Sequence, residues 1–207
     1  MKIGIIGAGN VGGNLGVRLS KSGFAVRFGL KDDKDASALL ARCEKGATAG
    51  SVEDAAKQSD VIFLAVPGTV AVSVAKSLAP HLEGKVLVDC NNPLTWKDGP
   101  VWAPPPEGSL AEALAKAAPG AKVVKAFNGF GAEHHLDPKG ADVFMAGDDQ
   151  GAKAAVAEIA NKAGFRAIDS GPLRNAGVVE NVAILWIHLA MVGGKGRGFS
   201  FVLKEDK

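Results

Sequence analysis

The sequence predicts an α/β fold in which a doubly wound parallel sheet carries a small helical extension at its C-terminal end. Short apolar runs alternate with helical patterns along most of the 207 residues, and this alternation is typical of βαβ units with right-handed crossovers. The first apolar run is followed at once by a glycine-rich turn and an amphipathic helix. The length suits one substantial core. We therefore expect a single domain over residues 1–207, with residues 170–207 forming a helix and a strand that close a cleft.

The glycine-rich turn near the start of the chain fits the pattern G-x-G-x-x-G. It lies between a buried strand expected over residues 2–6 and an amphipathic helix, the context that gives this pattern its meaning. The first glycine permits a tight turn, the second lets a pyrophosphate approach the backbone at the positive end of the helix, and the third lets the helix pack on the strand. The alternative is a glycine-rich turn that binds nothing. We favour a Rossmann domain that binds a nicotinamide dinucleotide through Gly7, Ala8, Gly9, Asn10, Val11 and Gly12.

The end of the second strand, expected over residues 24–28, favours NADP over NAD. An NAD enzyme usually places an Asp or Glu roughly twenty residues past the first glycines, where it bonds the ribose 2′-hydroxyl. Here that place holds Gly29, Leu30 and Lys31, so no carboxylate repels a 2′-phosphate and Lys31 offers it a positive charge. The alternative is that Lys31 is a solvated surface charge. Arg27 and Lys34 lie nearby in the sequence and could also bind the 2′-phosphate. Asp32 and Asp33 could bond a ribose hydroxyl instead.

The remaining elements follow from periodicity and from glycine and proline punctuation. In the first half we expect a helix over 35–45, a short strand at 47–49, a helix capped by Ser51, a buried strand over 61–66, a helix over 70–78 and a strand over 85–89. In the second half we expect a helix over 109–117, strands over 122–126 and 142–146, a helix over 150–163, a strand over 165–168, a long helix from Pro172 to about 192 and a final strand over 199–203.

Residues 91–108 interrupt this alternation with a proline-rich stretch, which we expect to be a long semi-rigid loop. Ordered loops at the carboxyl ends of parallel strands are often binding loops. Trp96 and Trp102 lie in this stretch. They either cover a planar ligand or pin the loop to the core, and the sequence favours neither role.

Composition and charge exclude several classes of function. A net charge of +2 gives no indication of nucleic-acid or membrane binding, so we expect neither partner. The apolar stretch over 178–192 is too short and too polar to span a bilayer. A strand that starts at residue 2 leaves no room for a signal peptide. Two cysteines on separate elements, Cys43 and Cys90, are expected to be reduced, and we expect a cytoplasmic protein.

Acid–base and metal chemistry have few candidates. The chain contains no Tyr, which excludes a phenolic general acid. Of the four histidines, only the adjacent pair His134 and His135 follows a strand near the expected cleft. Adjacent histidines on a loop bind no metal without a third ligand, so we expect no metal site and interpret this segment as a polar loop.

Several segments together resemble one family. They are GIIGAGNVG at 4–12, VDCNNPL at 88–94, VVKAFN at 123–128, AGDD at 146–149 and DSGPL at 169–173 followed by Glu180. The set resembles the NADPH-dependent reductases of the deazaflavin coenzyme F420, and also the cytosolic domain of the six-transmembrane metalloreductases. The resemblance implies a Rossmann domain with a small C-terminal extension over the cleft. It also implies NADP(H) as cofactor and hydride transfer between nicotinamide C4 and a stacked ring, which would belong to F420, FMN or FAD as the second substrate.

The same resemblance implies roles for particular residues. Lys31 would meet the 2′-phosphate, and Val66 and Pro67 would flank the nicotinamide ribose. The residues that would line the nicotinamide are Asn92, Ala126, Phe127 and Asn128, with Asn128 as the catalytic residue that aligns the two rings.

Two positions depart from the pattern of that family. Leu30-Lys31-Asp32 stands where these reductases tend to carry Ser-Arg-Arg, and Asn128 stands where many have His. The first departure predicts a weaker grip on the 2′-phosphate. The second leaves the identity of the hydride acceptor open.

Two other functions stay open at this point. One is a small-substrate NADPH reductase of the imine or hydroxyacid type. A hydroxyacid enzyme would need a Lys or His base beside its substrate. The other is a non-catalytic Rossmann module that senses a nucleotide. Separately, the 178–192 helix is apolar on more than one face and must be covered. We therefore expect a homodimer that uses this helix and the C-terminal segment.

Overall fold

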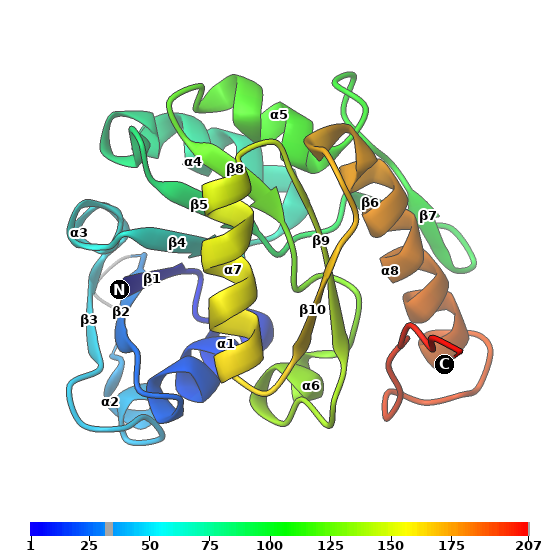
Figure 1. Cartoon of the computed structure of the whole chain (residues 1–207), viewed down its shortest axis with the longest axis horizontal. Coiled ribbons are helices and arrows are strands. Elements are labelled where there is room, and N and C mark those ends of the chain that lie inside the picture. Colours follow the sequence, from blue (N-terminus) through cyan, green and yellow to red (C-terminus); the bar gives the residue numbers. More distant parts are fainter. Residues whose placement is uncertain (32–34, 207) are drawn as a thin grey trace.

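The computed structural model describes residues 1–31 and 35–206, and its alternating strands and helices confirm the predicted α/β class (Figure 1). The first half contains β1 (Lys2–Ile6), α1 (Asn10–Lys21), β2 (Ala25–Leu30), α2 (Ser37–Leu40), β3 (Thr48–Ser51), α3 (Val52–Gln58), β4 (Val61–Leu64), α4 (Gly68–Leu82) and β5 (Val86–Asp89). The second half contains β6 (Leu94–Trp96), β7 (Pro100–Trp102), α5 (Leu110–Ala117), β8 (Lys122–Lys125), α6 (Ala132–Leu136), β9 (Asp142–Gly147), α7 (Gln150–Lys162), β10 (Arg166–Asp169), the 3₁₀ turn η1 (Leu173–Asn175) and α8 (Ala176–Met191).

The central sheet has the strand order β10-β9-β8-β5-β4-β1-β2-β3. The six strands from β8 to β3 in this order all pair in parallel. The chain winds outward in both directions from the boundary between β1 and β4. In doubly wound sheets, ligands bind in the crevice outside the carboxyl ends of the strands at such a boundary. The topology therefore places the candidate site beyond β1, β4 and β5.

One edge of the sheet departs from the expected parallel arrangement. β9 pairs antiparallel with β8, and β10 then pairs parallel with β9. A parallel neighbour needs a crossover connection, usually a helix that passes over a face of the sheet. The connection from β8 to β9 contains the five-residue helix α6, which packs against α1. A helix this short does not carry the chain back along the sheet, so the next strand runs in the opposite direction.

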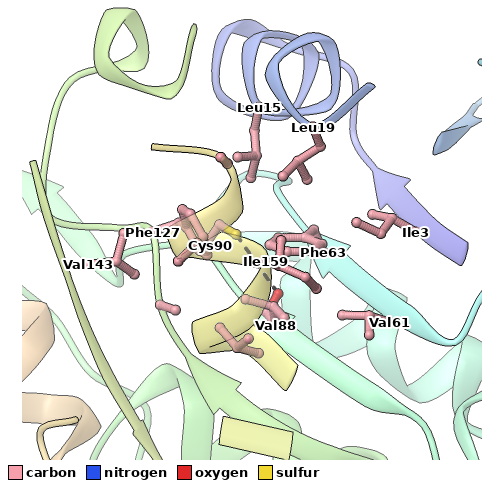
Figure 2. Close-up of a cluster of buried hydrophobic side chains, with 14 of the residues drawn as sticks. Ile3, Leu15, Leu19, Val61, Phe63, Val88, Cys90, Phe127, Val143 and Ile159 are labelled. Atoms are coloured by element: carbon pink, nitrogen blue, oxygen red, sulfur yellow. Dashed lines mark hydrogen bonds between the residues drawn. The ribbon is translucent and has the colours of Figure 1, made fainter. Parts of the chain in front are cut away.

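Helices cover both faces of the sheet. Val61 and Phe63 of β4 belong to a cluster with side chains from α1 and α7, whereas Ile62 and Leu64 belong to a cluster with side chains from α3, α4 and α5. Figure 2 shows the first cluster, in which α1 approaches the strands from one side. A strand buried on both faces reads as one continuous apolar run, as β4 does. In the described part of the chain, no helix is long and apolar enough to cross a membrane.

Three segments differ from their expected secondary structure. The helix expected over 35–45 is reduced to α2, because Cys43 N–H bonds Leu40 O and tightens the chain into a turn. The stretch 91–108 contains the antiparallel hairpin β6–β7, which packs beside α8 (Figure 1). The long helix expected from Pro172 begins with η1 and continues as α8.

The C-terminal segment after α8 is not the strand expected over 199–203. Side-chain contacts, rather than pairing with a neighbouring strand, fix the position of this segment. The Trp186 indole N–H donates to Phe199 O at 2.8 Å, and the rings of these two residues lie 5.5 Å apart. The Arg166 guanidinium donates to Leu203 O. This segment therefore covers one face of α8.

The turn after β8 has an unusual backbone that separates two neighbouring side chains. Phe127 has a φ of 61°, a left-handed conformation that non-glycine residues seldom adopt. Its ring is buried and packs edge-on against Phe63 and Phe165, with centroids 5.5 and 5.4 Å apart. Phe127 thereby lies in the core (Figure 2). The next residue, Asn128, instead bonds the side chain of Asn92 in the segment after β5.

His135 supports this turn. It lies on α6, which corrects the expected polar loop, and it is 1% exposed. Its Nε2 lies 2.9 Å from Phe127 O and its Nδ1 lies 3.2 Å from Gly131 O. Burial lowers the pKa of His135 to about 4, so the ring is neutral at pH 7.

Acidification should expose the cost of burying His135. In the unfolded chain an imidazole has a pKa of about 6.5, so the unfolded state takes up the proton first. The contribution of His135 to stability is fully present above pH 6.5 and is lost as the pH falls to about 4, by up to about 3 kcal/mol. His135→Gln should flatten the dependence of the free energy of unfolding on pH in this window, measured by denaturant titration.

The same substitution at His81, a more exposed histidine on α4, is the control and should leave the pH dependence near that of the native protein. An unchanged slope in His135→Gln would show that this imidazole titrates alike in both states.

Candidate functional site

The glycine turn after β1 contains glycines of two kinds. Gly7 has a φ of 95°, and a Cβ on it would lie 2.3 Å from Ala65 O. A Cβ on Gly12 would lie 1.8 Å from Gly7 O. A Cβ on Gly9, in contrast, would meet nothing within 4 Å. The packing of the protein therefore requires Gly7 and Gly12, whereas the bare backbone at Gly9 borders open space that suits a bound phosphate.

The N-terminus of α1 is prepared for an anion. Gly9 is the N-cap of this 12-residue helix, so no side chain caps it, and no acidic residue lies in the first turn. The N–H groups of the first turn and the helix dipole give this end a partial positive charge. Ala8 lies in the turn between Gly7 and Gly9. The turn and the helix start thus fit the pyrophosphate of a dinucleotide.

A pocket of about 340 Å³ opens beside this helix start. The residues that line it come from the start of α1 and from the segments that follow β4 and β5, at the boundary where the winding of the sheet reverses. Six residues expected from the sequence lie in it together, namely Gly9, Asn10, Val11, Val66, Pro67 and Asn92. The other four lining residues are Ala65, Cys90, Asn91 and Leu94.

Lys31 lies at the same edge of the sheet and is not among the residues that line this pocket. It follows β2, which pairs with β1, and it is exposed. The end of the second strand is where dinucleotide-binding folds meet the adenosine ribose. Arg27 lies within β2, and its guanidinium lies close to Gly50 of β3. The other candidates, Asp32, Asp33 and Lys34, lie outside the described residues.

Ala126 and Phe127 do not present their side chains to the pocket. Both side chains are buried in the core cluster that also contains residues of α1 and α7. The expectation that these two residues line the nicotinamide therefore holds at most for main-chain atoms.

Asn128 and Asn92 form a reciprocal amide pair. Asn92 lines the pocket, whereas Asn128 is not among its lining residues and borders a separate small cavity beside β9 and α8. Asn128 Nδ2 donates to Asn92 Oδ1 at 2.9 Å, and Asn92 Nδ2 donates to Asn128 O at 3.0 Å. Asn128 Nδ2 also donates to Val179 O of α8 at 3.4 Å. Within the described part of the chain, Asn128 Oδ1 accepts no hydrogen bond. That oxygen is available to a donor on a ligand, such as a carboxamide.

A buried ionic cluster lies behind the same wall. Lys125 Nζ lies 2.9 Å from Asp89 Oδ2 and 3.1 Å from Glu180 Oε1, and it also donates to Asn91 O. The sequence motifs predicted no role for Asp89, Lys125 or Glu180. Their signal was present nonetheless, because a charged residue at the end of a buried strand or inside an apolar helix is costly to bury and needs a partner.

The two tryptophans of the hairpin have different environments. Trp102 Nε1 donates to Glu180 Oε2 at 3.1 Å, so this residue pins the hairpin to α8. Trp96 is exposed. Leu94, two residues before Trp96 on β6, lines the pocket. Of the two alternatives left open by the sequence, anchoring therefore applies to Trp102.

Cys90 lies at the pocket but is not a reactive thiol. Burial, together with the neighbouring Asp89 carboxylate, raises the pKa of Cys90 well above its usual range, and a thiol must ionise to act as a nucleophile. His134 lies on α6 and is not among the residues that line this pocket. In the described ranges, no three His, Cys, Asp or Glu side chains are grouped so that they could hold a metal ion.

Comparison with known proteins agrees with this geometry. The family described as NADP oxidoreductase, coenzyme F420-dependent, matches residues 2–93, which include the glycine turn and the segment after β5. The F420-dependent NADP reductase of Methanocaldococcus jannaschii is 33% identical over 205 residues, covering 91% of this chain and 92% of that protein. Rat metalloreductase STEAP3 is 36% identical over 186 residues, which cover 88% of this chain but only 36% of that protein.

A solved structure extends the likeness to the whole fold. A protein from Arthrobacter sp. FB24, assigned as an F420-dependent NADP reductase, superposes with a TM-score of 0.86 at 29% identity, covering 99% of this chain and 100% of that one. The agreement thus includes the C-terminal helix as well as the nucleotide-binding half. The chain belongs to the family of F420-dependent NADP oxidoreductases.

Proposed function

We propose that this protein transfers a hydride between NADP(H) and the deazaflavin F420, the pair of compounds for which its relatives are named. The observation that carries the proposal is the pocket that joins the open backbone at Gly9 to Asn92, whose side chain is hydrogen-bonded to Asn128. The first of these suits a pyrophosphate, and the second suits the carboxamide at the other end of the cofactor.

The chemistry of the pocket suits transfer between two rings. When bound, NADPH supplies the hydride. The residues of the protein have to hold two planar groups in register, a task that needs proximity and little acid–base assistance. None of the described residues that line the pocket is a Lys, His, Asp or Glu. A hydroxyacid dehydrogenase would need a Lys or His base beside its substrate. The residues that line this pocket therefore favour a deazaflavin or flavin acceptor over a hydroxyacid substrate.

Each part of the site then has a task. The turn over residues 7–12 and the start of α1 bind the pyrophosphate, and residues 66–67 after β4 flank the ribose. The pair Asn92 and Asn128 fixes the carboxamide through Asn128 Oδ1. Asn128 Nδ2 also donates to Val179 O on α8. The orientation of the Asn128 amide therefore depends on α8 as well as on the segment after β5.

We further propose that the protein is a homodimer that uses α8 and the C-terminal segment. The face of α8 that carries Trp186 is covered by Phe199 of its own chain, which Phe201 supports. Another face leaves Val178 66% and Leu185 51% exposed. Large apolar side chains gathered on one exposed helix face are typical of an association surface, and a second copy of α8 offers the same apolar chemistry.

The acceptor is tested by following NADPH absorbance while F420, FMN, FAD and riboflavin are offered in turn. We expect F420 to be reduced fastest, because the relatives are named for it. Tight NADPH binding with no turnover of any acceptor would favour the nucleotide-sensing alternative. Turnover of an imine or a hydroxyacid alone would favour the small-substrate reductase.

Asn128→Ala should keep the NADPH dissociation constant within a few-fold and lower F420 reduction by an order of magnitude or more, because a small misalignment of two reacting groups costs about a hundredfold in rate. Steady-state kinetics and calorimetry measure the two quantities. Asn181→Ala is the control, since that exposed amide bonds only Gly177 O of its own helix among the described residues. Normal turnover by Asn128→Ala would remove this residue from the mechanism.

NADPH should bind at least about tenfold more tightly than NADH, a difference of about 1.4 kcal/mol. The reason is the absence of a carboxylate at Gly29 and the positive charge of Lys31 after β2. Lys31→Ala should narrow the difference, measured by calorimetry at low salt, with the exposed Lys76 of α4 changed to Ala as the control. Equal dissociation constants for the two cofactors in the native protein would refute this preference.

Leu185→Glu should convert a dimer into a monomer, because it places a charge in the middle of the proposed interface. Light scattering at micromolar concentration measures the mass, and Val70→Glu, at an exposed apolar residue of α4, is the control. A native protein that already has a monomeric mass would count against the dimer.

A further inference from the structure

The buried cluster of Asp89, Lys125 and Glu180 carries an unbalanced charge. The three residues are 0% exposed and come from the ends of β5 and β8 and from α8. Two carboxylates surround a single ammonium group. Burying three charges is expensive, and a neutral or evenly paired cluster would hold the same elements together at a lower cost.

The hydrogen bonds indicate the protonation of each group. Lys125 Nζ has three acceptors, namely Asp89 Oδ2, Glu180 Oε1 and Asn91 O, which match the three protons of an ammonium. The carboxylates only accept. Asp89 Oδ1 accepts from the main-chain N–H and from the side-chain Nδ2 of Asn91. Glu180 accepts from the Leu110 main-chain N–H and from Trp102 Nε1. Both carboxyl groups are therefore ionised, and the cluster carries a net charge of −1.

This charge lies directly behind the wall of the nucleotide pocket. Asn91 lines the pocket, and its main chain and side chain are held by Asp89 and Lys125. No charged side chain lines the pocket within the described ranges. A charge that is shielded from solvent acts through a medium of low dielectric and is little screened by salt. The field of the cluster therefore reaches the pocket.

The N-terminus of α5 offsets only part of this charge. Leu110 is the first residue of this eight-residue helix, and its N–H donates to Glu180 Oε1 at 3.0 Å. A helix end contributes at most about half an elementary charge. A negative excess therefore remains beside the pocket.

We propose that this excess charge makes the pocket favour the oxidised, cationic nicotinamide over the neutral reduced ring, so that Glu180 and Asp89 set the relative affinity for NADP⁺ and NADPH. The proposal rests on the function proposed above only in taking NADP(H) as the ligand. The two forms share the pyrophosphate and the 2′-phosphate, and the positive charge of the ring distinguishes them electrostatically. A residue that only stabilises the fold would weaken both forms alike, whereas a field acts on their ratio.

The test compares Trp102→Phe with the double variant Trp102→Phe/Glu180→Gln. A Gln at position 180 would turn its amide N–H toward the indole N–H of Trp102, and the Phe background removes that clash. The oxygen of the Gln can still accept from Leu110 and Lys125. Calorimetry without any hydride acceptor gives the dissociation constants for NADP⁺ and NADPH. We expect the ratio of the NADP⁺ constant to the NADPH constant to rise by about threefold to tenfold, as expected for a unit charge acting across a protein interior.

Two further measurements sharpen this test. Asp89→Asn removes a charge on the other side of Lys125 and should shift the ratio in the same direction, and it serves where the double variant does not fold. The shift should persist at high salt. Glu53→Gln removes an exposed negative charge on α3 and should leave the ratio unchanged.

An unchanged ratio in a folded Glu180 or Asp89 variant would overturn this inference while leaving the proposed function intact, because turnover of F420 by the native protein is measured separately. A native protein that binds neither form of the cofactor would overturn both.

Discussion

The burial of the Lys125 ammonium between Asp89 and Glu180 is the constraint on which the architecture around the site depends. Moving an isolated charge out of water costs far more than one contact returns, so each group requires its partners. Lys125 and Asp89 join β8 to β5. Glu180 brings in α8, receives the Trp102 indole of the hairpin and accepts from the first N–H of α5. Removing Lys125 would leave two uncompensated carboxylates, and breaking a buried ion pair in this way typically costs about 3–5 kcal/mol.

This cluster links the central sheet to α8 and to the β6–β7 hairpin. The segment after β5 that lines the pocket is fixed by hydrogen bonds from Asn91 to Asp89. On α8, the residue before Glu180 offers its carbonyl to Asn128. The left-handed turn at Phe127, supported by His135, separates the core side chain from the neighbouring amide. The geometry of the Asn128 amide therefore depends on packing that is remote from the pocket itself.

Features that depend on adjacent residues could be predicted from the sequence, and features that depend on distant contacts could not. The glycine turn at 7–12 and the α/β class follow from local spacing and from the alternation of elements. The pairing of Asn92 with Asn128 joins residues 36 positions apart, and only the resemblance to a family brought them together. The reversed direction of β9 depends on where α6 packs, and the C-terminal segment lacks strand structure because Trp186 binds its backbone.

Direct passage of hydride from one ring to the other within this pocket is tested by isotope transfer. NADPH labelled with deuterium at nicotinamide C4 on the transferred side is incubated with the protein and F420, and the reduced deazaflavin is examined by mass spectrometry. A deazaflavin carries carbon where a flavin carries N5, so transferred deuterium is retained. Direct transfer predicts one deuterium per reduced molecule in ordinary water. Reduced F420 that contains only solvent hydrogen, or no reduction at all, would contradict it.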